Sequence, residues 1–135
     1  MILDRFINEM KYVSGIEVGG AYTFKDDVDF KYKSVQFQQF PQYTTYESLL
    51  DNVDAVYINT PLTQRDKLIV AALEKGKHVL TEFPFSLNYQ KAREFVKTAS
   101  EKGLVLMEGL KTAYCPAFGK MISLVKSGRI GKILS

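Results

Sequence analysis

Three short apolar runs at regular intervals constrain the fold of this chain more than any other feature. They are DAVYINT (54–60), HVLTE (78–82) and LVLME (104–108). Such runs are typical of strands that are buried on both faces of a parallel sheet. Helical patterns over about 63–75 and 88–102 separate them, and Gly76 and Gly103 end these helices. Because parallel strands need crossover connections, the alternation predicts an α/β fold with a parallel sheet and helices on both faces.

The flanking segments follow related patterns. Apolar residues at helical spacing predict a helix from Ile2 to Val13, and Pro116 stands in the first turn of a last helix that Gly128 ends. The other predicted elements are a strand at 16–23, one or two helical turns at 46–50 and the start of a strand at 130–134. Residues 25–45 fit a poor helix, a short strand or an aromatic loop.

Composition narrows the possible functions. The 135 residues suffice for one domain with its own core, and the net charge is only +3 with scattered basic residues. Nucleic-acid binding is therefore not expected, because it requires basic side chains that cluster on one face. No apolar run reaches the roughly 18 residues of a membrane span, so no membrane association is expected. The single cysteine, Cys115, excludes an internal disulfide and favours a cytoplasmic location.

Polar or unusual residues follow each of the three central strands. They are Thr60-Pro61, Glu82-Phe83-Pro84 and Glu108-Gly109. The carboxyl ends of parallel strands lie at one edge of the sheet, and ligands of open α/β sheets bind at that edge. We therefore expect Glu82 to face a ligand crevice.

The sequence resembles a known family at this point. The segments that carry the resemblance are DAVYINTP (54–61), AALEKGKHVLTEFP (71–84), LVLMEGLKTAYCPAF (104–118) and SGRIGKI (127–133). Their order and spacing are similar to those of the glucose–fructose oxidoreductase, inositol dehydrogenase and rhizopine-catabolism (Gfo/Idh/MocA) family. The resemblance implies NAD(P)-dependent hydride transfer with a small sugar or polyol substrate, on a Rossmann domain followed by a larger α/β domain.

The resemblance also implies what the chain lacks. Met1 falls where the family's glycine-rich phosphate loop ends, and no G-x-G-x-x-G occurs in the sequence. We therefore expect a Rossmann-like domain over 1–128 without the first strand and glycine loop. Residues 129–135 are then the start of a C-terminal α/β domain that the chain does not contain.

Several cofactor-side residues follow from matching the family motifs. They are Thr60, Pro61, Leu62, Arg65, Glu82, Phe83, Pro84 and Glu108. Phe83 stands where the family usually has a lysine that polarises the reacting hydroxyl, and a phenyl ring cannot do so. Leu62 and Arg65 likewise replace the family's frequent asparagine and histidine. The resemblance further implies a cis Phe83–Pro84 bond, and it names neither a catalytic residue nor a metal ligand in this chain.

Other chemistry-bearing residues have structural interpretations as well. Lys111 and Tyr114 follow the strand at 104–108, and both could point to the substrate side. In the structural interpretation, Lys111 lies in water and Tyr114 packs against the last helix. His78, at the head of a strand, is expected to be structural, as is Cys115. The run Tyr22 to Asp27 holds both basic and acidic residues, so the choice between NAD and NADP stays open.

Three functions remain after these considerations. The first is a truncated or inactive NAD(P)-dependent sugar or polyol oxidoreductase. The second is a non-catalytic Rossmann-fold subunit that forms homo-oligomers through an exposed sheet edge. The third is a binding module for another nucleotide-like ligand.

Overall fold

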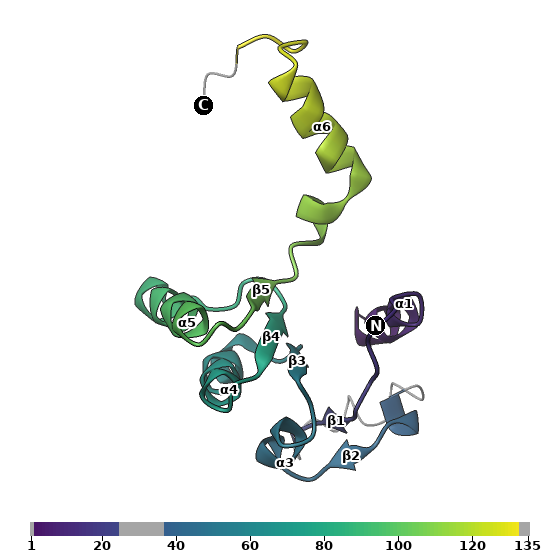
Figure 1. Cartoon of the computed structure of the whole chain (residues 1–135), viewed down its shortest axis with the longest axis vertical. Helices are drawn as coiled ribbons and strands as arrows, with labels where there is room; N and C mark the ends of the chain where they lie inside the picture. The colour runs from purple at the N-terminus through teal and green to yellow at the C-terminus, as the bar shows by residue number, and fades with distance from the viewer. Residues whose placement is uncertain (1, 25–36, 133–135) are drawn as a thin grey trace.

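The computed structural model of the chain describes residues 2–24 and 37–132 (Figure 1). Its helices and strands follow in the order α1 (Ile2–Met10), β1 (Ala21–Tyr22), the 3-10 helix η1 (Phe37–Gln39), β2 (Gln42–Tyr43), α3 (Tyr46–Leu50), β3 (Ala55–Ile58), α4 (Leu62–Glu74), β4 (His78–Thr81), α5 (Tyr89–Glu101), β5 (Leu106–Glu108), the 3-10 helix η2 (Lys111–Tyr114) and α6 (Pro116–Lys126).

The central strands form the predicted parallel sheet in the order β3-β4-β5. The register places Ile58 of β3 beside Thr81 of β4, and Thr81 beside Glu108 of β5. The prediction of an α/β fold with parallel strands is therefore confirmed. Strands β1 and β2 are also parallel but form a separate two-stranded sheet, so the described residues do not join into one continuous sheet.

Side-chain alternation divides the central sheet into two different faces. Val56, Ile58 and Val79 belong to the buried core, in which α4 and α5 also take part. Tyr57 and Leu80 point to the opposite face, where α1 lies and Phe6 stacks on Tyr57 with ring centroids 4.0 Å apart. Helices therefore occupy both faces, as predicted, but α1 covers only the β3 side of its face (Figure 1).

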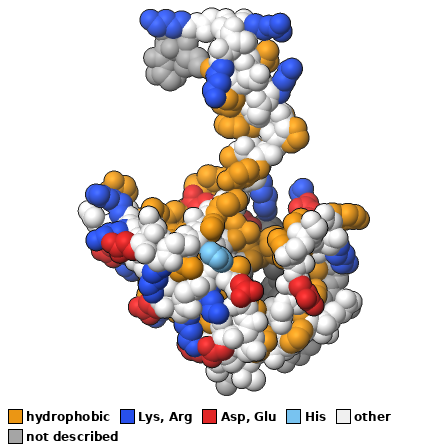
Figure 2. All heavy atoms as spheres, in the orientation of Figure 1, with side chains coloured by type: hydrophobic (Ala, Val, Ile, Leu, Met, Phe, Trp, Pro, Cys, Tyr) orange, Lys and Arg blue, Asp and Glu red, His pale blue; other side chains and the backbone are white. Residues whose placement is uncertain are grey.

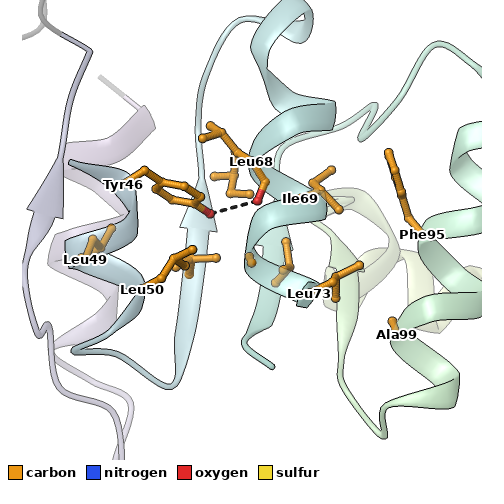
Figure 3. Close-up of a cluster of buried hydrophobic side chains, with 12 residues drawn as sticks. Tyr46, Leu49, Leu50, Leu68, Ile69, Leu73, Phe95 and Ala99 are labelled. Atoms are coloured by element: carbon orange, nitrogen blue, oxygen red, sulfur yellow. Dashed lines mark hydrogen bonds between the residues drawn. The ribbon is translucent and has the colours of Figure 1, made fainter. Parts of the chain in front are cut away.

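The core joins the two sheets through α3 (Figure 3). Leu50 of α3 and Ile69 and Leu73 of α4 are almost fully buried. Tyr46 of α3 donates a hydrogen bond from its hydroxyl to the Leu68 carbonyl oxygen at 3.1 Å, which satisfies a buried polar group. Because Tyr22 and Tyr43 pack against the same cluster, the small sheet depends on the large sheet for its burial.

The predicted strand at 16–23 is wrong in extent, since only Ala21 and Tyr22 pair. In the described part of the chain, β1 pairs with β2 alone. Gly20 has a φ of +152° that an L side chain rarely adopts. A Cβ at Gly20 would also lie 2.4 Å from the Tyr43 ring, so a glycine is required there. Residues 16–20 consequently run as irregular chain without a ladder partner among the described residues.

Three other predicted boundaries also shift. Helix α1 ends at Met10 rather than Val13, because Tyr12 and Val13 make i to i−3 hydrogen bonds that tighten the chain into a turn. Strand β5 starts at Leu106, since the Leu104 amide bonds back to the Ala99 carbonyl as part of the α5 cap. No strand begins at 130–132, and the remainder of the predicted strand at 130–134 lies outside the described residues.

Within the segment 25–45 that the sequence left open, the described part holds η1 and β2. Residues 25–36 lie outside the described residues. They include Lys25 to Asp27, on which the choice between NAD and NADP depended.

The N-cap of helix α5 allows a test of how much helix capping stabilises this fold. Asn88 is its N-cap, and the side-chain oxygen accepts a hydrogen bond from the Lys91 amide at 3.1 Å. We expect Asn88→Ala to lower the free energy of unfolding by about 1 kcal/mol, because one amide at the helix start loses its partner. Urea denaturation measures this loss, and Gln90→Ala on the exposed side of the same helix is the control that should change little.

Candidate functional site

The topology brings the three predicted strand ends together. Strands β3, β4 and β5 are neighbours and parallel, so Thr60-Pro61, Glu82-Phe83-Pro84 and Glu108-Gly109 follow adjacent strands at one sheet edge. The Gly109 amide donates to the Thr81 carbonyl at 2.8 Å, and the Glu82 amide donates to the Ile58 carbonyl at 3.2 Å. These bonds extend the ladder to the strand ends and hold the edge in a fixed shape.

Arg65 is the structural centre of this edge. Its side chain is only 6% exposed, and the guanidinium donates to three backbone carbonyls. Nη2 donates to Thr60 O at 2.6 Å, whereas Nη1 donates to Glu82 O at 2.8 Å and to Pro84 O. Arg65 therefore ties the turn after β3 to the turn after β4.

Burial lowers the pKa of Arg65 from its ordinary value, and the nearby charges of Glu82 and Glu108 oppose that shift. An arginine stays protonated even so, and three carbonyl acceptors compensate for part of its desolvation. The Phe83–Pro84 bond, in the turn that Arg65 holds, is cis, as the resemblance implied.

Glu82 faces the side of the sheet on which α1 lies. The Tyr57 hydroxyl donates a hydrogen bond to its Oε1, and Lys111 Nζ lies 3.7 Å from the same oxygen. Burial raises the pKa of Tyr57 above its ordinary value, and the hydrogen bond to Glu82 raises it further. A phenol, a carboxylate and an ammonium group are thus connected at the end of the sheet.

These three side chains border a hollow of about 370 Å³, which we call the Glu82 hollow. Its floor is the row Tyr57, Leu80 and Met107, which the register aligns across the three strands. The remaining lining residues are Arg5, Phe6 and Glu9 from α1, with Glu82, Gly109, Lys111 and Tyr114. An apolar floor with charged groups at its end suits a small polar molecule that also has an apolar face.

The other predicted site residues have more varied surroundings. Glu108 accepts a hydrogen bond from the Phe85 amide at 2.8 Å through Oε1, so its carboxylate supports the turn after β4. Pro61 precedes α4 and Leu62 is its first residue. Phe83 is 60% exposed and points its ring into solvent. The Thr60 hydroxyl oxygen is buried and has no hydrogen-bond partner within residues 2–24 and 37–132.

Lys111 and Tyr114 lie nearer the site than their structural interpretation predicted. Lys111 is exposed but pairs with Glu82, and the Tyr114 hydroxyl lies 3.9 Å from the Met107 sulfur. His78 has the expected structural role, because its Nδ1 accepts a hydrogen bond from the Val105 amide at 2.9 Å. Cys115 is partly buried just before α6.

Sequence reasoning missed Tyr57 and the α1 residues of the hollow. Tyr57 carries a hydroxyl within the apolar run DAVYINT, and that anomaly was available as a signal. The contribution of Phe6 and Glu9 depends on where α1 packs, which no local pattern shows. Within residues 2–24 and 37–132, no group of three metal-ligating side chains lies together, and no helix is long and apolar enough to cross a bilayer.

The parallel strand order, the helices on both faces and the polar strand ends define a nucleotide-binding type of α/β fold. A family model described as "Oxidoreductase family, NAD-binding Rossmann fold" matches residues 27–110, which is more than half of the chain. The chain therefore belongs to the Gfo/Idh/MocA oxidoreductase family, as its motifs indicated.

Individual relatives agree with this assignment. The chain is 40% identical over 93 residues to D-xylose 1-dehydrogenase (NADP(+)) of Hypocrea jecorina. This match covers 67% of this chain and 24% of that protein. It is 39% identical over 71 residues to scyllo-inositol 2-dehydrogenase (NADP(+)) IolU of Bacillus subtilis, covering 53% of this chain and 22% of that protein. The chain thus spans about a quarter of the length of the curated relatives that it matches.

Solved structures give the same result. The 3-ketoreductase KijD10 of Actinomadura kijaniata, crystallised with NADP and TDP-benzene, has a TM-score of 0.76 and 27% identity, over 90% of this chain and 38% of that chain. Myo-inositol 2-dehydrogenase of Lactobacillus plantarum has a TM-score of 0.81 over 98% of this chain and 40% of that chain. Its identity is 21%, so this second likeness concerns the fold alone.

Proposed function

We propose that the chain forms the nicotinamide side of an NAD(P)-dependent oxidoreductase site for a sugar or polyol. The observation that carries the proposal is the juxtaposition of Thr60, Glu82 and Lys111 at adjacent strand ends of a family Rossmann fold. The buried Thr60 hydroxyl has no hydrogen-bond partner among the residues that the structure describes, and such a group ordinarily requires one. A polar group of the bound cofactor supplies that partner in our proposal.

The residues present fit one end of a dinucleotide better than the other. Thr60, Pro61 and Leu62 would contact the nicotinamide ribose, with Glu82, Phe83, Pro84 and Glu108 beside them and Arg65 as the group that positions both turns. The sequence offers no glycine-rich loop for the pyrophosphate, so this contact is lacking within the 135 residues. When bound, the nicotinamide ring accepts or donates a hydride.

Lys111 is the group we assign to the substrate oxygen. The Phe83 side chain has no hydrogen-bond donor, whereas the Lys111 ammonium lies 3.7 Å from Glu82 at the border of the hollow. An ammonium group at this position can polarise a carbonyl or an alcohol. Hydroxyl groups of a polyol would bind Glu82 and Lys111, while its C–H groups rest on Leu80 and Met107.

Calorimetric titration with NAD, NADP and their reduced forms tests the proposal. We expect binding of at least one form, and Thr60→Val should weaken it about 3- to 10-fold, because a neutral hydrogen bond contributes about 0.5–1.5 kcal/mol. Thr44→Val, at an exposed position before α3, is the matched control and should leave the affinity unchanged. Absence of binding at millimolar concentrations of all four forms would contradict the proposed function.

A second candidate function is a non-catalytic subunit of the same fold, which the exposed Phe83 ring favours. The two functions differ in turnover. An enzyme should change the absorbance of the reduced cofactor with some member of a sugar and polyol panel and should lose that activity in Lys111→Met. A non-catalytic subunit should bind the cofactor without turnover, in both the wild-type chain and the variant.

A further inference from the structure

Strand β3 places a hydroxyl group among apolar side chains. Figure 2 shows hydrophobic side chains gathered at the junction between the sheet and α6. In the floor of the Glu82 hollow, Tyr57 pairs in register with Leu80 of β4, and Leu80 with Met107 of β5. Because side chains alternate along a strand, Glu82 lies on the same face as Leu80 and follows it toward the strand end. The Tyr57 hydroxyl therefore reaches the Glu82 carboxylate diagonally, across two neighbouring strands.

The position of that hydroxyl is fixed by the packing of its ring. Phe6 of α1 stacks on the Tyr57 ring with centroids 4.0 Å apart and an angle of 24° between the ring planes. Burial raises the pKa of Tyr57, and the hydrogen bond to Glu82 raises it further, so the phenol stays protonated at neutral pH. The hydroxyl is consequently a hydrogen-bond donor that is held in one place.

The two carboxylate oxygens of Glu82 have different surroundings. Oε1 accepts the hydrogen bond from Tyr57 and lies 3.7 Å from Lys111 Nζ, whereas Oε2 has no partner within residues 2–24 and 37–132. The last torsion of a glutamate side chain is broad, so a carboxylate does not by itself keep one oxygen toward a lysine. A donor on a packed ring removes that freedom.

We propose that Tyr57 is a positioning residue for the pair formed by Glu82 and Lys111. Its hydroxyl holds Oε1 beside the ammonium group and leaves Oε2 for a hydroxyl group of the ligand. The inference rests on the proposed function, in which this pair binds a sugar or polyol. Tyr57 acts through Glu82, and it strengthens binding because a carboxylate that is already oriented loses less freedom when the ligand arrives.

Nuclear magnetic resonance tests the positioning without any ligand. The full chain is produced with isotope-labelled lysine, and Lys111→Arg identifies the Lys111 side-chain signal. We expect Tyr57→Phe to move this signal toward that of the exposed Lys120, as Glu82→Gln should, because both variants release the ammonium group from Oε1. Phenylalanine keeps the ring that stacks on Phe6, so a lost ring current does not explain the shift.

Tyr12→Phe is the matched control for the loss of a tyrosine hydroxyl. Tyr12 is 91% exposed, so its variant should leave the Lys111 signal in place. A Lys111 signal that Glu82→Gln moves and Tyr57→Phe does not would give Tyr57 a purely structural role and overturn the proposal. So would a signal that neither variant moves, because Glu82 and Lys111 would then not be paired in solution.

Calorimetric titration with inositol and xylitol, in the presence of the cofactor, measures the consequence for binding. Tyr57→Phe should weaken the binding of these polyols about 3- to 10-fold, because it removes one neutral donor, and Tyr12→Phe should not. In the Glu82→Gln background, Tyr57→Phe should have no further effect, since it acts through that carboxylate. Effects that multiply in the double variant would overturn the proposal.

The two measurements keep this inference separate from the proposed function. A chain that binds no cofactor contradicts the proposed function, and the Lys111 signal then still decides whether Tyr57 positions the pair. A chain that binds cofactor and polyol, with a Lys111 signal and a polyol affinity that Tyr57→Phe leaves unchanged, keeps the proposed function and overturns the inference.

Discussion

Replacing Arg65 with methionine is expected to lower the free energy of unfolding by about 3–5 kcal/mol. The side chain is 6% exposed and donates to the carbonyls of Thr60, Glu82 and Pro84. Methionine fills a similar volume but has no donor, so the carbonyls of Thr60 and Pro84 lose the donor that Arg65 supplies, and the Glu82 carbonyl keeps only the Thr81 hydroxyl at 3.4 Å. Each unsatisfied buried acceptor costs about 1–3 kcal/mol, partly offset because burial of the guanidinium itself is unfavourable.

Urea denaturation followed by circular dichroism measures the effect of Arg65→Met. Arg65→Lys should lose most of the same stability, since one ammonium group cannot reach three carbonyls in the fork geometry of a guanidinium. Arg129→Met is the control, because Arg129 is exposed after α6 and its replacement should change stability by less than about 0.5 kcal/mol. If Arg65→Met and Arg129→Met change the free energy of unfolding equally, the hydrogen bonds of Arg65 do not stabilise the strand ends.

Leu50→Ala should destabilise the protein by about 2–5 kcal/mol. Leu50 is 0% exposed and lies in α3, in the core cluster against which both the small and the large sheet pack (Figure 3). Truncation to alanine removes apolar contacts and leaves a cavity that the surrounding helices can fill only in part. Because α3 joins the two sheets, we expect amide exchange to accelerate in β1 and β2 more than in β4.

Leu87 offers a matched control for this substitution. It is 78% exposed before α5, so Leu87→Ala removes the same atoms without a buried cavity. Its effect on the free energy of unfolding should stay within about 0.5 kcal/mol. Equal losses in the two variants, measured by the same urea denaturation, would contradict the position of Leu50 at the centre of the core.

The central strands and helices were predictable because their signals are local. The apolar runs before Pro61, Glu82 and Glu108 correspond to β3, β4 and β5, and the glycines that end the helices stand after α4 and α5. Strand β1 was predicted too long, because its pairing depends on β2, which lies about twenty residues further along the chain. The Gly20 conformation depends likewise on the approach of Tyr43.

The candidate site was only partly predictable for the same reason. The adjacency of Thr60, Glu82 and Glu108 follows from the strand order, which the alternation of elements dictates. The sequence alone determined the α/β class, the family and the strand ends at which a ligand would bind, because these depend on local patterns and short motifs. Only the tertiary structure decided that Arg65 holds three carbonyls and that Tyr57 and Lys111 meet Glu82, because side chains from separate elements come together only when the elements pack.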